Sequence, residues 1–235
     1  MAFDSFDNEI ARLAILQRIE LATPFLVKIR KLFGRYLFTN FFTKFLLPKH
    51  KINYRYYNRM LDEYNSLSKY IDFANKNILS IGAGMCGLEL IIDKFNTVNQ
   101  FSIIEKNYVS KKIKYGWDDK NFEAYNNLTI LKNFLKNNLK NSNFNVYDFD
   151  SDNFPHSKFD IIISLYSLDY HYNFSIYKDY FAKICSDKTL IVFDTIRPNY
   201  FEKFFNRVEV VSETKKRIHS SKRIICSEII NDKFK

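Results

Sequence analysis

Three of the chain's five glycines fall within six consecutive residues, where an apolar run gives way to a helical pattern. The string GAGMCG at positions 82–87 follows the β-prone residues 78–81. Gly82 permits a tight turn, Gly84 lets backbone approach a ligand without interference from a Cβ, and Gly87 allows close packing of a helix. This pattern is typical of a turn whose backbone binds a nucleotide-like cofactor, although a turn without a ligand is the alternative.

Acidic residues end the next two predicted strands. Glu105 lies 18 residues after Gly87, a spacing at which a carboxylate accepts hydrogen bonds from both ribose hydroxyls of an adenosine. Asp148 is the candidate contact for the adenine amino group, in competition with Asp150 and Asp152. The candidate cofactor-binding residues are Gly82, Ala83, Gly84, Gly87, Glu105, Lys106, Asp148, Phe149, Ser164 and Leu165.

Groups that can move a proton are concentrated in residues 164–172, directly after another apolar strand. His171 is the predicted general base, because an unperturbed pKa near 6.5 suits proton abstraction at neutral pH. A histidine that is hydrogen-bonded within its loop is the alternative. Asp169 is the second candidate catalytic residue, and three roles are open to it: orienting His171, deprotonating the acceptor itself, or capping the helix near Phe174.

Polar residues at the end of the following strand are candidates for substrate binding. Arg197 suits a carboxylate, a phosphate or a vicinal diol, and a loop-stabilising pair with Asp194 is the alternative. A divalent cation held by Asp169, His171 and Asp194 is disfavoured, because no acid-rich cluster supplies the usual oxygen ligands, so we predict no metal site. The predicted substrate-binding residues are Tyr166, Tyr170, Asp194 and Arg197.

These residues require a sheet whose strands end along one edge. Residues 108–140, between two of the strands, are expected to be mostly helical and to contain two helices. The last two strands are joined by a polar stretch too short for a helical crossover, so they are antiparallel. The order predicts an α/β fold with a doubly wound, Rossmann-like, mostly parallel sheet and an antiparallel C-terminal edge strand. The apolar runs lie at 78–81, 101–105, 145–148, 159–165, 189–194, 208–212 and 222–230.

An N-terminal helical segment precedes the sheet, and we divide the chain into residues 1–70 and 71–235. From Leu21 to Leu61 the chain has nine Lys or Arg residues, ten aromatic residues and no acid. The net charge is +10, so the rest of the chain carries only +1. Three interpretations of residues 21–61 are open: a helical lid over the sheet domain, a peripheral contact with an anionic membrane, and, less favoured, a nucleic-acid contact.

Composition bounds the setting of the protein. With 235 residues and 46% hydrophobic content, the chain is long enough for one α/β domain with an appendage. Its three cysteines are odd in number and lack CxxC pairing, which favours a reducing cytoplasm over a disulfide framework. The sequence shows no apolar run of spanning length and no basic signal-peptide region, so we expect a cytoplasmic protein, peripheral to the inner membrane face in one interpretation. Its oligomeric state stays open.

Residues 77–230 resemble the class I S-adenosylmethionine-dependent methyltransferases. The resemblance lies in ILSIGAGMCG as the first motif, the acid of FSIIEKN as a ribose contact, the Asp of VYDFD as an adenine contact, and FDIIISLYSL as the strand beneath the methyl donor. Nicotinamide enzymes of this layout generally need a further catalytic domain, and the terminal antiparallel strand favours methyltransferases. Many family members carry an acid where this chain has Ser80, which affects the expected contact with the methionyl ammonium.

The resemblance implies S-adenosylmethionine as the cofactor and a methyl acceptor as the substrate. Similar strings with a His-Tyr pair occur in sugar and small-molecule O-methyltransferases, so the expected acceptor is a hydroxyl of a sugar, a glycan or another small polar molecule. An RNA methyltransferase is the alternative, weakened because Ser-Leu-Tyr-Ser replaces the Asn-Pro-Pro-Tyr type of motif after the central strand. A non-catalytic cofactor-binding or scaffold protein with the same fold is a third hypothesis.

Overall fold

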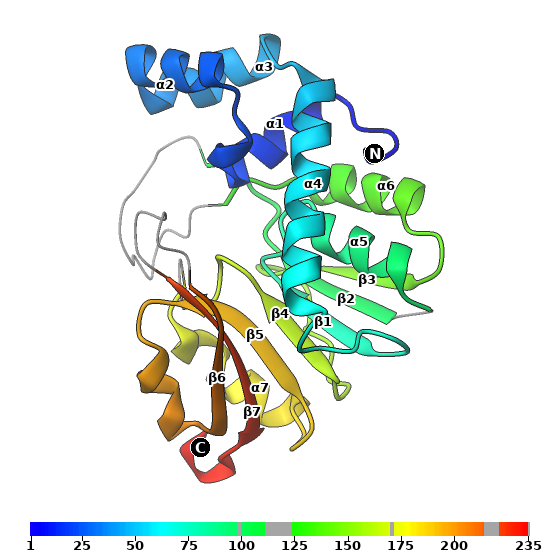
Figure 1. The fold of residues 1–235 in the computed structure, drawn as a ribbon, viewed down its shortest axis with the longest axis vertical. Helices are drawn as coiled ribbons and strands as arrows, with labels where there is room; N and C mark the ends of the chain where they lie inside the picture. Colours follow the sequence, from blue (N-terminus) through cyan, green and yellow to red (C-terminus); the bar gives the residue numbers. More distant parts are fainter. Residues whose placement is uncertain (98–99, 111–123, 170–171, 214–220, 235) are drawn as a thin grey trace.

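The computed structural model describes residues 1–97, 100–110, 124–169, 172–213 and 221–234. Seven strands form one sheet in the order β3-β2-β1-β4-β5-β7-β6, flanked by helices (Figure 1). The chain winds outward from β1 to β3 in one direction and from β4 in the other, so the order reverses between β1 and β4. Such a reversal leaves a crevice at the carboxyl ends of the two strands.

The first five strands are parallel, and the last two form an antiparallel pair at one side. The predicted fold class is therefore confirmed. Within the pair, β7 lies between β5 and β6, so that β6 is the outermost strand. The strands span β1 Asn77–Ile81, β2 Gln100–Glu105, β3 Asn143–Asp148, β4 Ile161–Ser164, β5 Leu190–Thr195, β6 Phe205–Glu213 and β7 Lys222–Ile229.

Helices cover both faces of the sheet and bury two hydrophobic cores. Side chains alternate along each strand, so Ile78 faces the core shared with α5 (Gly87–Phe95) and α6 (Leu128–Asn138). Its neighbour Leu79 faces the second core, built with α7 (Lys178–Ile184). Because the strands are covered on both faces, their sequences read as continuous apolar runs.

The N-terminal helices pack beside α5 and α6 and extend beyond the sheet (Figure 1). Thr23 caps α2 through the amide of Leu26, and Pro24 occupies the first turn. Gly34 has φ 77° and bends α2 before a π-helical turn at Phe38–Phe42. The segment comprises α1 Asn8–Gln17, α2 Pro24–Leu37, α3 Thr43–Phe45 and α4 Lys49–Leu67.

The expectation of two helices in residues 108–140 falls in part on residues 111–123, which lie outside the described residues. Of the described part of residues 108–140, only α6 is helical, and Val109 instead forms an antiparallel bridge with Tyr125. The apolar core continues from α1 and α4 into the sheet, and the division at residue 70 stays a prediction. Among the described residues, every helix is too short or too polar to cross a membrane.

Candidate functional site

The glycine turn connects β1 to α5 at the reversal of strand order. Gly82 has φ 64°, and a Cβ there would overlap Oγ of Ser167, which follows β4. Gly84 has φ 62°, in the left-handed region that favours glycine. The turn therefore holds backbone at the crevice where a side chain would not fit.

Glu105 reaches the turn from the end of β2. Its Oε2 accepts a hydrogen bond from the amide of Gly84 at 2.7 Å, and its Oε1 accepts one from the amide of Lys106 at 3.2 Å. Asn126 contacts the same group and donates to the carbonyl of Gly84 at 2.9 Å. Burial raises the pKa of Glu105 to about 7, although these neutral donors oppose the shift.

Two side chains of the N-terminal helices also reach the turn. Gln17, the last residue of α1, accepts a hydrogen bond from the amide of Met85 at 3.1 Å and donates to the carbonyl of Tyr125 at 2.6 Å. Tyr56 of α4 accepts from the amide of Gly87 at 2.9 Å. A Cβ on Gly87 would lie 2.5 Å from Tyr56, so this glycine permits α4 to pack on α5.

A cavity of about 970 Å³ lies between the N-terminal helices and the strand ends. Glu105 and residues 82–84 line one side, and residues 165–167 line the side next to β4. The cavity thus opens at the reversal between β1 and β4, as expected for a doubly wound sheet. Its wall from the N-terminal segment includes Arg18, Glu20, Arg30, Arg35, Phe38, Arg55, Asn58, Arg59 and Asp62.

The candidate adenine contacts lie beside Glu105 at the end of β3. Asp148 accepts a hydrogen bond from the amide of Asp150 at 3.1 Å, and its own amide donates to Asp152 at 2.7 Å. Lys106 pairs with Asp150 at 2.9 Å and lies 4.9 Å from the ring centroid of Phe149. Asp150 is therefore the partner of Lys106, and the carboxylate of Asp148 is held within the turn that follows the strand.

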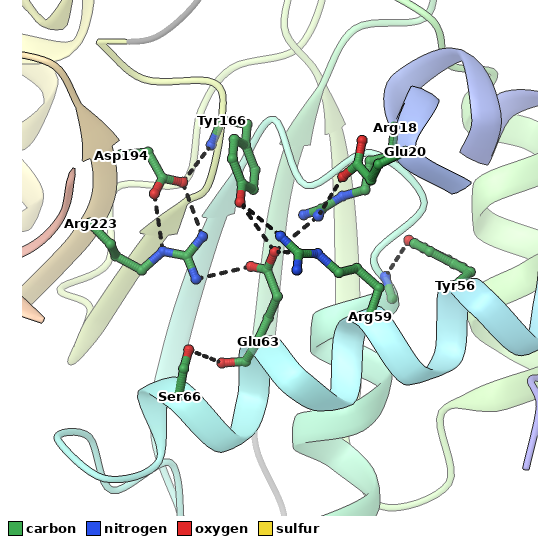
Figure 2. Close-up of polar contacts among 10 residues, drawn as sticks. Arg18, Glu20, Tyr56, Arg59, Glu63, Ser66, Tyr166, Asp194 and Arg223 are labelled. Carbon is green, nitrogen blue, oxygen red and sulfur yellow. Dashed lines mark hydrogen bonds and ion pairs between the residues drawn. The ribbon is translucent and has the colours of Figure 1, made fainter. Parts of the chain in front are cut away.

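Residues after β4 divide between structural and cavity-lining roles. Ser164 donates to the carbonyl of Ile81 at 2.9 Å and accepts from the amide of Leu168 at 3.0 Å, so its hydroxyl stabilises the strand end. Leu165 and Tyr166 line the cavity. Tyr166 has φ 59°, a left-handed conformation that is rare for an aromatic residue and directs its side chain toward α4 (Figure 2).

Asp169 is part of an ion pair. Its carboxylate accepts hydrogen bonds from Arg197 at 2.5 Å and from the hydroxyl of Thr195 at 2.6 Å. The helix near Phe174 is capped instead by Asn173, so a capping role for Asp169 is wrong. The other candidates in this stretch, Tyr170 and His171, lie outside the described residues.

Asp194 pairs with Arg223 of β7 through two hydrogen bonds, at 3.2 and 3.1 Å. The alternative pair of Asp194 with Arg197 is therefore wrong, since Arg197 binds Asp169. Asp194 also accepts from the amide of Tyr166 at 3.1 Å. Both Asp194 and Arg197 lie outside the cavity lining, and their assignment to substrate binding stays a prediction.

Glu63 of α4 joins this pair to the N-terminal helices (Figure 2). Its carboxylate contacts Arg18 at 3.0 Å, Arg223 at 3.0 Å and Arg59 at 3.5 Å. Burial alone would raise the pKa of Glu63, but the three guanidinium groups lower it to about 2. The network locks α4 onto β5 and β7 at one wall of the cavity.

Several site residues escaped the sequence analysis, and two of them carry a signal. Glu63 lies at helical spacing with the buried residues Tyr56, Met60 and Leu67, so an acid on an apolar helix face marked it. Glu89 follows the glycine turn in the first turn of α5, is buried and lines the cavity, and burial raises its pKa. No local signal distinguished the others: Gln17, Arg18, Asn126 and Arg223.

Two of the comparisons with known proteins find no match. No family model and no curated protein matches the chain. Among the described residues, no three His, Cys, Asp or Glu side chains are grouped so as to hold a metal ion.

Similar solved structures include several methyltransferases. A magnesium protoporphyrin IX methyltransferase from Synechocystis PCC 6803 with bound SAM has TM-score 0.45 and 11% identity, covering 96% of this chain and 99% of that one. A precorrin-6y C5,15-methyltransferase from Geobacter metallireducens has TM-score 0.42 and 15% identity, covering 78% and 90%.

A 16S rRNA methyltransferase from T. Thermophilus in complex with AdoMet and guanosine has TM-score 0.45 and 12% identity. That match covers 74% of this chain and 42% of the rRNA methyltransferase. All three TM-scores lie below 0.5, so no functional conclusion follows from these likenesses.

Proposed function

We propose that the protein transfers a methyl group from S-adenosylmethionine to a hydroxyl of a sugar or another small polar acceptor. The observation that carries this proposal is the carboxylate of Glu105 on the amide of Gly84, both lining the cavity at the reversal of strand order. A two-pronged acceptor beside a side-chain-free turn suits the ribose and tail of an adenosine-bearing donor.

The residues present fit such a donor. The hydrogen-bond donors to Glu105 are the amides of Gly84 and Lys106 and the side chain of Asn126, all neutral, so ribose hydroxyls can replace or share them. The donor, when bound, supplies an activated methyl on a sulfonium. The chain must then align the acceptor and receive one proton, and no covalent intermediate with the protein is required.

The polar wall of the cavity favours a polar acceptor. Arg55, Asn58, Arg59 and Asp62 of α4 line the cavity opposite the glycine turn and can hydrogen-bond hydroxyl or anionic groups. The cavity volume of about 970 Å³ is large enough for a donor together with a small acceptor. His171 stays the predicted base, and its replacement by alanine should lower kcat with little change in donor affinity.

Calorimetric titration with S-adenosylmethionine tests the proposal. We expect saturable binding by the parent and a loss of affinity of about 10- to 100-fold in Glu105→Ala, because a hydrogen bond to a charged group contributes about 1.5–3 kcal/mol. Glu209→Ala, which removes an exposed carboxylate from β6, is the matched control and should bind as the parent does.

A second variant examines the turn itself. Gly84→Val places a branched side chain at φ 62° and should abolish binding while the far-ultraviolet circular dichroism stays that of the parent. Absence of donor binding by the parent would favour the non-catalytic hypothesis. Methyl transfer is then measured with labelled donor against a panel of sugars, phenols and carboxylates, and transfer to carboxylates alone would contradict the hydroxyl assignment.

A further inference from the structure

Large hydrophobic side chains gather on the outer face of residues 24–47. Among the described residues, half of the exposed large hydrophobic side chains fall in this segment, and Leu32 and Phe45 are 77% and 70% exposed. Scattered exposed side chains are normal, whereas a contiguous group marks an interaction surface. We name as the apolar patch Phe25, Leu32, Phe33, Tyr36, Leu37, Phe41, Phe45 and Leu46.

The apolar patch is distinct from the face that these helices bury. Leu26, Ile29 and Phe38 already pack into the core on the opposite side. On the outer face, the ring centroids of Phe41 and Phe45 are 5.4 Å apart, so two solvent-exposed aromatic rings contact each other. A helix that is apolar on both sides requires a second partner.

The segment that carries the apolar patch is strongly basic. The residues from Leu21 to Leu61 contain nine Lys or Arg and no acid, although the rest of the chain is nearly neutral. Lys28, Lys31 and Lys44 are exposed in the same segment as the patch, whereas Arg30 and Arg35 line the cavity. The partner must therefore offer both a non-polar region and negative charge.

We propose that the outer face of residues 24–47 docks onto the surface of an anionic lipid bilayer. The apolar patch enters the boundary between headgroups and acyl chains, and the lysines contact the headgroups. A second copy of the chain would bring two cationic segments together, which is repulsive. The three leucines of the patch suit lipid better than bases, and because its other five residues are aromatic, RNA is kept as an outcome of the tests below.

The arrangement of the helices suits docking without obstruction of the cavity. They form the end of the molecule farthest from the C-terminus (Figure 1). Arg30, Phe38 and Thr39 of the same segment line the cavity on the inner side. One side of the segment therefore faces lipid while the other stays in the site.

Vesicle flotation tests the proposal without methyl donor, so its outcome does not depend on the proposed enzymatic function. We expect the protein to float with vesicles of phosphatidylglycerol and phosphatidylcholine, to remain largely unbound with phosphatidylcholine alone, and to bind less as salt increases. Equal binding to both kinds of vesicle, or binding to neither of them, would overturn the proposal.

The apolar contribution is tested by replacing three exposed side chains with serine: Leu32, Phe41 and Phe45. We expect the partition coefficient to fall by at least about 100-fold, since each side chain loses its burial in the interface. The control replaces three exposed side chains outside the segment with serine: Tyr70, Ile176 and Ile196. Equal partition of patch variant and parent would overturn the proposal.

The charge contribution is tested by replacing the three patch lysines with glutamine: Lys28, Lys31 and Lys44. A fall of about 100-fold is expected, compared with little change when three other exposed lysines are replaced: Lys132, Lys136 and Lys183. Concentration-dependent dimerisation that the serine variant abolishes, without vesicle binding, would assign the surface to a second copy. RNA binding that only the lysine variant loses, again without vesicle binding, would assign it to nucleic acid.

Discussion

Carboxylates at two places on the sheet have different kinds of partner. At the end of β2, Glu105 contacts backbone amides and an amide side chain, which carry no charge. In β5, Asp194 is held by the guanidinium group of Arg223, and Asp169 nearby is held by Arg197. The first carboxylate can exchange its partners for a ligand at modest cost, whereas the other two would leave a buried cation or anion unpaired.

The comparison shows that an acid near the end of a strand is not by itself a binding residue. The groups that satisfy the carboxylate determine whether it is available. On this basis Glu105 is the strongest candidate for ligand binding among the three, whereas Asp169 and Asp194 are engaged in ion pairs with Arg197 and Arg223. Variants that remove one partner at each place make this difference measurable.

The largest effect is expected at the centre of the charged network. Glu63→Gln leaves Arg18 and Arg223 buried without their shared carboxylate, so the free energy of unfolding should fall by about 3–5 kcal/mol. Urea denaturation measures this loss. Glu9→Gln removes a carboxylate that is 52% exposed and pairs with Arg12, and should cost less than about 0.5 kcal/mol.

The same network has a defined dependence on pH. The pKa of Glu63 is lowered to about 2 in the folded protein, so its stabilising contribution is fully present above the unfolded pKa near 4.5. It is lost as the pH falls from about 5 toward 2. The stability difference between parent and Glu63→Gln should shrink over this interval, and a constant difference would show that the ion pairs are not its cause.

A smaller loss is expected at the other paired carboxylate. Arg197→Ala leaves Asp169 buried with the hydroxyl of Thr195 as a remaining partner, and should cost about 2–3 kcal/mol in urea denaturation. Arg207→Ala, which breaks an exposed pair with Glu209, is the control. Similar losses in both arginine variants would remove the distinction between buried and exposed pairs.

The smallest expected effect is the change of donor affinity with pH that follows from the titration of Glu105. Burial raises its pKa to about 7, so most of the group is protonated at pH 6 and ionised at pH 8. If the ionised form accepts both ribose hydroxyls, donor affinity should increase by about 10-fold over this range. Calorimetry at each pH measures the profile. Glu105→Gln should flatten it, and parallel profiles for parent and variant would exclude Glu105 as the titrating group.

The glycine-turn side of the sheet was the predictable side because its information is local. The turn and Glu105 lie within 24 residues of one another, and the apolar runs of the strands are unbroken. Residue types with steric or hydrogen-bonding requirements at fixed spacing identify such an arrangement. The doubly wound order of the strands followed from the helices between them.

The charged network was not predictable because it depends on which strands become neighbours. Asp194 and Arg223 face each other only because β7 inserts beside β5, in the register that pairs these two residues. Arg197 is close to Asp194 in the sequence and was therefore its expected partner. The actual partner of Asp194 is Arg223, which lies on the neighbouring strand β7. The contact of Gln17 with the glycine turn likewise depends on where α1 packs. The spacing of apolar residues in α1 predicts a helix but not the place where the helix packs.

The bond between Glu63 and Arg223 has a consequence for biosynthesis. Arg223 lies 160 positions after Glu63, so the ribosome synthesises α4 well before the strand that carries Arg223. Until then, nascent chains hold Glu63 with Arg18 and Arg59 alone, and Asp194 lacks its guanidinium partner. We therefore expect a nascent chain stalled before β7 to hold α4 on the sheet through fewer ion pairs than the folded protein does.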